Sequence, residues 1–282
     1  MIQGVIFDMD GLMFDTERIW DTCWAPALAK FGLSYKEGLS QASRGTTRSG
    51  TCDVLRRFYG DGCPAAGIVE ELYRLGYEAF TKPVPKMAGL DELLAWLDAH
   101  HIPMAVASSS PMTIIEGHLN HWQLGHYFKA VISGEHLARS KPAPDIFLLA
   151  AEKLGTAPAE TLVLEDSYNG VRAGAAGGFV TVMVPDLSPA TDEMRRLYTC
   201  ECTSLHEVCK KLEAGAFDEG CRGGCRCPLP YRMGLSSCFR AFISFPCTSP
   251  SPASSQLRGQ RHSGGPALPD PAHRYSGRSH PF

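Results

Sequence analysis

VIFDMDGLMFDTE, residues 5–17, is the most informative stretch of the chain, because two aspartates follow directly on an uninterrupted apolar run. Residues 1–8 suit a strand that is buried on both faces of a parallel sheet. Side chains alternate along a strand, so Asp8 and Asp10 point the same way, and Gly11 lets the backbone leave the strand. Two buried carboxylates this close repel each other unless something pairs with them. The stretch is therefore either a solvated turn or part of a cation site.

A helical region follows the first strand. Apolar residues recur at helical spacing over residues 17–31, and similar patterns predict helices over about 47–59 and 65–80. No strand pattern interrupts residues 17–80, and the prolines and glycine of TKPVPKMAG then indicate a linker. We therefore expect an all-helical insert between the first strand and the rest of the sheet.

Beyond the linker, helices and apolar strands alternate. The predicted order is helix 89–100, strand 103–108, a helix from 111, strand 130–132, helix 144–154, strand 161–166, helix 168–176, strand 179–184 and a last helix in SLHEVCKKLEAG. This rhythm is typical of an α/β fold with a doubly wound parallel sheet. Ligands of such sheets bind at the carboxyl ends of the strands. Because Asp8, Ser108 and Glu165–Asp166 all lie at such ends, we expect them to converge on one site.

Net charge limits the classes of partner. The chain of 282 residues has a net charge of −3, but residues 1–215 carry 19 Lys/Arg against 27 Asp/Glu, a net charge of −8. An acidic body argues against a nucleic-acid surface, which needs clustered Lys and Arg. No apolar run approaches the roughly 18–20 residues of a membrane span, and no signal peptide is recognised. We expect a cytoplasmic monomer without nucleic-acid or membrane partners.

Residues 216–282 differ in composition from the rest of the chain. They carry 8 Arg, no Lys and 3 acids, are rich in Gly, Pro and Ser, and show no sustained periodicity. Such a composition predicts disorder, and we hypothesise a non-functional extension from a shifted or read-through reading frame. Five of the eleven cysteines lie there, and their C-x3-C-x-C run lacks the C-x2-C pairs of a zinc site. The other six have no paired spacing, which favours reduced thiols.

Two further motifs place polar side chains ahead of helices. In VASSSP, Ser108 ends a strand and Pro111 suits the first turn of the next helix, where free backbone N–H groups can hold a phosphate. In SKPAPDIF, Lys141 can neutralise a phosphate and a carboxylate together. Each motif also has an ordinary interpretation, as a serine-rich helix cap and as a solvated surface lysine.

The carboxylates at two strand ends form a candidate metal site. Asp8 and Asp10 lie at the first of these ends, and Glu165 and Asp166 lie at the other. Hard oxygen ligands of this kind suit Mg²⁺, which binds one or two carboxylates together with waters and substrate phosphate. Magnesium is therefore the cofactor that the residues favour.

The four motifs, taken in order, carry more information than any one of them. DMDG, a strand-terminal serine, KPAPDIF and LEDSYNGVRAGAAGG closely resemble the motifs of the haloacid dehalogenase-like superfamily of phosphotransferases. The nearest match is its β-phosphoglucomutase-like branch, which has a helical cap inserted after the first strand. The resemblance covers about residues 1–215. It implies a Rossmann-like core domain (1–15 and 83–215) and a helical cap domain (16–82), followed by the tail (216–282).

The resemblance also implies roles for five residues. Asp8 is the nucleophile that forms an aspartyl-phosphate intermediate, since a carboxylate needs no activating base. Asp10 protonates the leaving oxygen and then deprotonates the attacking water. Ser108 binds the transferring phosphoryl group with the backbone N–H of Ser109, and Lys141 bridges Asp8 and the phosphate.

The same resemblance implies a metal site and a substrate ligand. Mg²⁺ would be held by Asp8, the backbone carbonyl of Asp10 and Asp166, with Glu165 close by. In the cap motif RGTTR, Arg48 matches an arginine that grips a distal phosphate or another anionic group; otherwise it is a solvated arginine at a helix start.

A magnesium-dependent phosphatase acting on a small phosphorylated metabolite, such as a sugar phosphate, is the function that we expect. Mutases of the branch carry a histidine where this chain has Trp20, and their cap lysine falls near Tyr73. Both differences favour a hydrolase over the alternative, a β-phosphoglucomutase-like phosphosugar mutase. A catalytically idle binding protein on the same fold is a further alternative. Such a protein is expected to have lost Asp8, Asp10 or Lys141, and none of these is lost.

Overall fold

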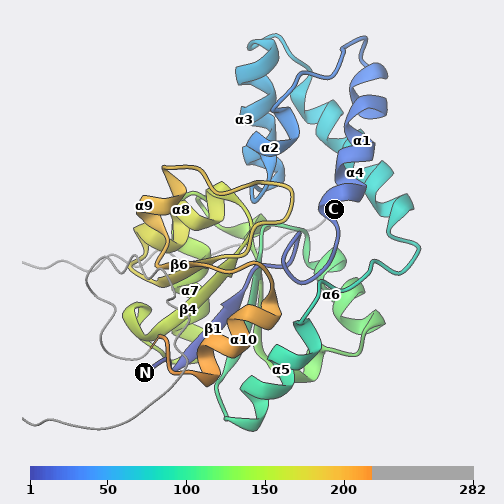
Figure 1. Cartoon of the computed structure of the whole chain (residues 1–282). Coiled ribbons are helices and arrows are strands. Elements are labelled where there is room, and N and C mark those ends of the chain that lie inside the picture. The colour runs from blue at the N-terminus through green and yellow to red at the C-terminus, as the bar shows by residue number, and fades with distance from the viewer. Residues whose placement is uncertain (218–282) are drawn as a thin grey trace, which may run out of the picture. The chain divides into compact units, whose positions relative to one another are not determined.

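The computed structural model describes residues 1–217, which belong to one compact unit (Figure 1). Along the chain, one strand is followed by four helices and then by alternating helices and strands. Within residues 1–217, no helix is both long and apolar enough to cross a membrane. The predicted tail lies outside the described residues apart from its first two positions, so its disorder and its origin stay predictions.

The predicted parallel sheet is confirmed and has six strands. They are β1 (Gly4–Phe7), β2 (Met104–Ser108), β3 (Phe128–Ser133), β4 (Thr161–Glu165), β5 (Val180–Met183) and β6 (Cys200–Glu201). Their order is β3-β2-β1-β4-β5-β6, and every neighbouring pair is parallel. The first strand is therefore central: Val5 is paired with Met104 on one side and with Leu162 on the other.

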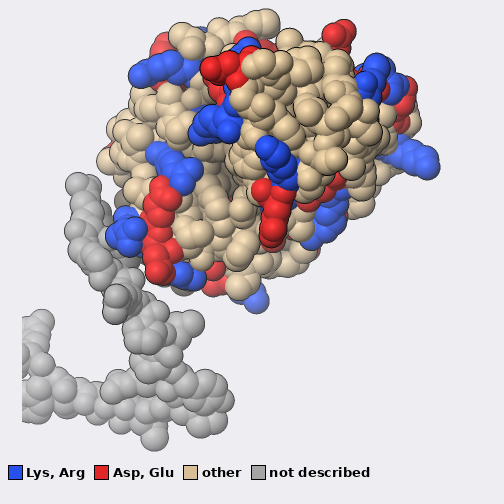
Figure 2. Space-filling model, turned by 90° about the horizontal axis from the view of Figure 1, so that it is seen from above, with Lys and Arg blue, Asp and Glu red and all other residues tan. Residues whose placement is uncertain are grey.

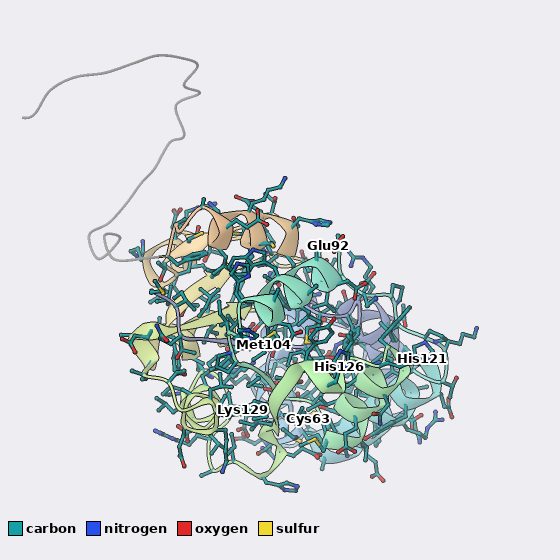
Figure 3. All side chains as sticks on the ribbon, turned by 90° about the horizontal axis from the view of Figure 1, so that it is seen from below. Cys63, Glu92, Met104, His121, His126 and Lys129 are labelled. Carbon is teal, nitrogen blue, oxygen red and sulfur yellow. The ribbon has the colours of Figure 1, made fainter. Side chains whose placement is uncertain are left out.

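Helices cover both faces of the sheet, and β1 is apolar at every position. The helices of the sheet region are α5 (Leu90–Ala99), α6 (Met112–His121), α7 (Asp145–Leu154), α8 (Tyr168–Ala176), α9 (Met194–Leu197) and α10 (Leu205–Glu213). Val5 and Phe7 pack in the same buried cluster as residues of α5, α6 and α10, whereas Ile6 packs with α7. Figure 3 shows the molecule from below, where α5, which carries Glu92, lies beside α10. This two-sided burial explains why the strands lack a polar face.

Four helices form the insert between β1 and β2. They are α1 (Glu17–Ala29), α2 (Leu39–Ser43), α3 (Arg48–Tyr59) and α4 (Ala65–Ala79), and they lie together at the top of Figure 1. Three were predicted to within two residues at each end, while α2 was missed because five residues are too short to show a helical period. Helix α1 packs on α4 through buried apolar side chains such as Trp24 and Ile68. The exact division into core and cap domains stays a prediction.

The insert is joined to the sheet region by two segments that run side by side. The Asp15 N–H donates to the Pro85 carbonyl over 3.0 Å, and the Met87 N–H donates to the Met13 carbonyl over 2.9 Å. Both segments lie next to the carboxyl end of β1. The connection therefore holds the helices over the edge of the sheet where the predicted site residues lie.

Seen from the side of the insert, acidic and basic side chains are interspersed on the described surface (Figure 2). Several of them are ion pairs on the insert helices, such as Arg56 with Asp53 at 2.8 Å. This arrangement is that of an ordinary solvated surface.

Candidate active site

Asp8 is the first residue after β1, and its side chain is almost fully buried. Its backbone N–H donates to the Leu164 carbonyl over 3.0 Å, which keeps it in line with the strand. The chain then turns at Gly11, where φ is +79° and a Cβ atom would collide with the Asp166 carboxylate. Glycine is required there for both reasons. The turn brings the ends of β1 and β4 close together.

Lys141 forms the electrostatic centre of the site. Its fully buried ammonium donates to Asp8 Oδ1 at 2.5 Å, to Glu165 Oε1 at 2.6 Å and to the Ala107 carbonyl at 3.2 Å. These acceptors use all three of its protons. Burial lowers the pKa of Lys141, but the two carboxylates outweigh this effect, so the pKa is raised and the ammonium stays charged. The predicted pairing of Lys141 with Asp8 is thus present.

Glu165 supports the lysine from the end of β4. Its Oε2 accepts the backbone N–H of Ser167 at 3.0 Å and the Ser167 hydroxyl at 2.9 Å, while Oε1 is bonded to Lys141. Helix α8 packs against this carboxylate at Gly170, where a Cβ atom would overlap it. Both oxygens of Glu165 are therefore engaged by donors of the protein. The residue orients Lys141 more directly than it offers a ligand to a metal.

Asp166 is the carboxylate of the site that is left without a donor. It is 1% exposed, and neither of its oxygens has a hydrogen-bond partner. Burial, and then the neighbouring Glu165 charge, raise the pKa of Asp166 well above its usual value. Asp8, Glu165 and Asp166 each place one oxygen within 4.8 Å of the others. An orphaned buried carboxylate beside a second one fits the oxygen ligands that a divalent cation such as Mg²⁺ takes.

Asp10 faces the serine run that follows β2. Its Oδ2 accepts from the Ser108 hydroxyl at 3.0 Å and from the Ser110 hydroxyl at 2.7 Å, while Oδ1 is buried without a partner. The Ser108 oxygen also accepts the backbone N–H of Ser110 at 3.0 Å. Ser108 is fully buried, whereas Ser109 and Ser110 line the cavity in front of Asp8. Ser110 was not predicted, although its place in the same serine run was the available signal.

The cavity in front of Asp8 has a volume of about 60 Å³ and lies between the insert and the sheet. Its lining comprises Asp8, Asp10, Glu17, Trp20, Trp24, Ser40, Ser43, Arg44, Gly45, Thr46, Thr51, Leu72, Tyr73, Ser109 and Ser110. The rings of Trp20 and Tyr73, whose centroids are 5.1 Å apart, form one wall. The cavity therefore combines acids and hydroxyls with an aromatic side.

Arg48, the predicted substrate ligand, is not among the residues that line this cavity. Its guanidinium lies over the ring of Tyr73 at 4.1 Å, and its Nε is 3.5 Å from Glu135 Oε1. The arginine in the cavity is Arg44, four residues earlier. A sequence pattern could not tell the two apart, because both belong to RGTTR.

Arg44 is buried and tightly bonded. Its Nε donates to Glu17 Oε2 at 3.0 Å, its Nη2 donates to both oxygens of Asp21 at 3.2 and 3.0 Å, and its Nη1 donates to the Ser188 hydroxyl at 2.9 Å. Burial and then the Asp10 charge raise the pKa of Glu17 to about 8, against the opposing effect of Arg44. Nothing local in the sequence indicates this cluster, because it joins residues from α1, the insert loop and the segment after β5.

The loop between α2 and α3 docks on the sheet region at three points. The Ser109 hydroxyl donates to the Gly45 carbonyl at 2.8 Å, and the Asn169 amide donates to the Arg44 carbonyl at 2.8 Å. Gly45 has φ of +70°, and a Cβ atom there would collide with the Ser167 hydroxyl. The loop therefore forms part of the cavity lining and is held there by close backbone contact.

The molecule has an α/β sheet with a helical insert, and buried carboxylates and a lysine lie at the carboxyl edge of the sheet. These features define its class, and comparisons with known proteins agree. Residues 5–184 match the haloacid dehalogenase-like hydrolase family. The chain belongs to this family. The family predicted from the four motifs is thus confirmed.

Two curated proteins are similar along most of their length. The fructose-1-phosphate phosphatase YqaB of Escherichia coli (strain K12) is 32% identical over 181 residues, covering 64% of this chain and 95% of that protein. Hexitol phosphatase B of the same strain is 30% identical over 213 residues, covering 74% and 96%. Both relatives are named as phosphatases. The prediction that the chain is an enzyme of this family is confirmed.

A solved structure of β-phosphoglucomutase from Clostridium difficile has a TM-score of 0.68 and 21% identity, covering 78% of this chain and 98% of that chain. At this identity the similarity establishes the fold. It agrees with the predicted sheet and with the helices inserted after the first strand.

Proposed function

We propose that the protein is a magnesium-dependent phosphatase that hydrolyses a small phosphorylated metabolite, such as a sugar phosphate, through an aspartyl-phosphate intermediate. One observation carries the proposal: Asp8 lines a cavity while its carboxylate is bonded to buried Lys141 and lies beside the unpartnered Asp166. A charge arrangement of this kind suits phosphoryl transfer, which depends on positioning and on neutralisation of the phosphate.

Asp8 is the nucleophile in this proposal. One of its carboxylate oxygens bonds to phosphorus while the bond between phosphorus and the ester oxygen breaks. Because Lys141 holds Oδ1, the other oxygen is the one free to attack. Water then attacks phosphorus, the bond to Asp8 breaks, and inorganic phosphate leaves with Asp8 restored.

Asp10 serves as the general acid and base. It gives a proton to the leaving oxygen and takes one from the attacking water, so no net proton is gained or lost by the residue. Ser108 and Ser110 both bond to Oδ2, which orients the carboxyl and leaves Oδ1 for the proton transfer. In this proposal Ser109, which lines the cavity, binds the transferring phosphoryl group through its backbone N–H.

Asp8, Asp166 and the backbone carbonyl of Asp10 are the proposed Mg²⁺ ligands. The ion would supply positive charge that keeps Asp8 ionised and neutralises the phosphate. Burial, with the Glu165 and Asp10 charges, raises the pKa of Asp8 to about 8 although Lys141 opposes the shift, so added positive charge is needed for a carboxylate nucleophile at neutral pH. Glu165 acts through Lys141 rather than as a direct ligand.

A hydrolase is favoured over a mutase by the cavity wall. Trp20 and Tyr73, which stand where mutases of the branch have a histidine and a lysine, both line the cavity. An indole has no titratable proton at neutral pH, and the pKa of buried Tyr73 is raised further above its usual value. The named activities of the two E. coli relatives support a sugar phosphate as substrate. Cytoplasmic location and a monomeric state stay predictions.

The test is release of inorganic phosphate from a panel of sugar phosphates, with and without Mg²⁺, by the wild type and Asp8→Asn. The matched control is Asp53→Asn, the same change at an exposed position of α3. We expect magnesium-dependent release by the wild type and the control and none by Asp8→Asn. Release by Asp8→Asn would refute the proposed nucleophile, and isomerisation of β-glucose 1-phosphate without release would establish the mutase.

A further inference from the structure

We infer that the cavity selects phosphate monoesters whose remaining part is neutral and polyhydroxylated, and that the cluster of Glu17, Arg44 and Asp21 excludes esters with a second anionic group. The inference rests on the proposed phosphatase activity, because it names the substrate class of the same site. It follows from the charges, the hydrogen bonds and the side-chain types around the cavity.

The first observation is the charge of the lining. Among the described residues that line the cavity, three are acids (Asp8, Asp10 and Glu17) and one, Arg44, is a base. Lys141 and the proposed cation site lie next to Asp8, where they serve the reacting phosphate. Any positive charge for a second anion of the substrate would therefore have to come from Arg44.

The second observation is that Arg44 is already neutralised. A guanidinium has five N–H donors, and four hydrogen bonds from Arg44 end on Glu17, Asp21 and Ser188. Two of these partners are carboxylates, and the arginine side chain is 7% exposed. A second anion of the substrate beside Arg44 would have to displace a bond that Arg44 already makes, and it would be repelled by the Asp21 carboxylate that accepts from the same guanidinium.

The third observation concerns Arg48, the other arginine of RGTTR and the first residue of α3. It lies over the ring of Tyr73 and close to Glu135, outside the cavity lining. Of the two arginines of RGTTR, only Arg44 lines the cavity, and it is already paired; Arg48 lies outside the lining. Selection against a second anion is the consequence.

The rest of the lining suits a sugar or a polyol. Ser40, Ser43, Thr46 and Thr51 are part of the lining. Their hydroxyl protons are donated to acceptors of the protein, which leaves the hydroxyl oxygens to accept from the hydroxyls of a polyol. The Trp20 ring, with Trp24 and Leu72 in the same lining, offers an apolar surface for the C–H groups of such a substrate.

The test compares esters that differ in one anionic group. Glucitol 6-phosphate is paired with 6-phosphogluconate, and fructose 1-phosphate with fructose 1,6-bisphosphate. For the wild type with Mg²⁺, we expect kcat/KM to be higher by about tenfold or more for the neutral-bodied member of each pair. An equal or higher kcat/KM for the anionic member overturns the inference and leaves the phosphatase intact. Failure to release phosphate from any ester overturns both.

Asp21→Asn tests the role of the cluster, because it removes one of the carboxylates that hold Arg44 without changing the size of the side chain. We expect the ratio within each pair to fall toward one, mainly through a lower KM for the anionic member. Asp53→Asn, which removes an exposed acid from the same insert, is the control and should keep the wild-type ratio. Glu17→Gln is the second variant, used also if Asp21→Asn does not fold. Wild-type ratios in both variants would overturn the assignment to the cluster.

Discussion

Replacement of Lys141 by methionine removes the charge that lies between two buried carboxylates. The wild-type ammonium is within 2.5 Å of Asp8 and 2.6 Å of Glu165, and all three side chains are almost completely buried. Removing one partner of a buried ion pair leaves an uncompensated charge and costs about 3–5 kcal/mol. For a domain of this size, that loss lowers the Tm by about 6–20 °C.

The pH dependence of this loss has a definite sign. In the wild type, burial raises the pKa of Asp8 to about 8 although Lys141 opposes the shift, and removal of the lysine raises this pKa further. A carboxyl whose folded-state pKa lies above its unfolded value of about 3.9 binds a proton on folding, so low pH favours the folded form. Between the two folded-state pKa values, at about 8 and above it, only the variant binds this proton as the pH falls. The difference in stability between Lys141→Met and the wild type should therefore shrink as the pH falls toward 8 and stay constant below it.

The assay is urea or thermal denaturation of both proteins at pH 7 and pH 9 in the presence of EDTA. Lys153→Met, at an exposed position of α7, is the matched control and should change the stability by no more than about 0.5 kcal/mol. A loss below about 1 kcal/mol for Lys141→Met, or a loss that is larger at pH 7 than at pH 9, would refute the reasoning.

Three further predictions concern the glycines and the metal site. Gly45→Ala should lower the free energy of unfolding by about 1–3 kcal/mol more than Gly32→Ala does, because both glycines have φ of +70° but only a Cβ atom at Gly45 meets a serine side chain. Equal losses of stability in urea denaturation would contradict this. Gly170→Ala should lower the free energy of unfolding by about 2 kcal/mol or more and abolish most activity. Gly117→Ala, which adds a Cβ atom in open space on α6, should raise the free energy of unfolding by about 0.5–1 kcal/mol. Added Mg²⁺ should raise the Tm of the wild type but not that of Asp166→Asn, and equal shifts would exclude Asp166 as a ligand.

Most of the sheet could be predicted because its strands are short apolar runs that are buried on both faces. VIF, MAVAS and TLVLE each read as a strand without knowledge of their neighbours. Strand β6 was missed, since its two residues, Cys200 and Glu201, contain no apolar run, and α9 was missed because its four residues are too few for a period. Elements of this size are fixed by the surface on which they pack.

The positions of the candidate site residues at the strand ends could be predicted from the sequence, whereas their roles stay predictions. Asp8 and Lys141 were expected to meet, and they do, at 2.5 Å. Arg44 was not singled out, since its partners Glu17 and Ser188 are 27 and 144 residues away in the chain. No local pattern records a pairing of that kind, because it depends on how the insert docks.

The central position of β1 has a consequence for synthesis of the chain. Val5 leaves the ribosome first, but its partners Met104 and Leu162 follow about 100 and 157 residues later. At about 5–20 residues per second, the apolar strand waits on the order of 8–30 s before both neighbours exist. Helices α1 to α4 have local contacts and are complete well before that time. A nascent chain of this protein therefore carries a folded insert beside an unpaired apolar strand, the segment for which a chaperone would compete.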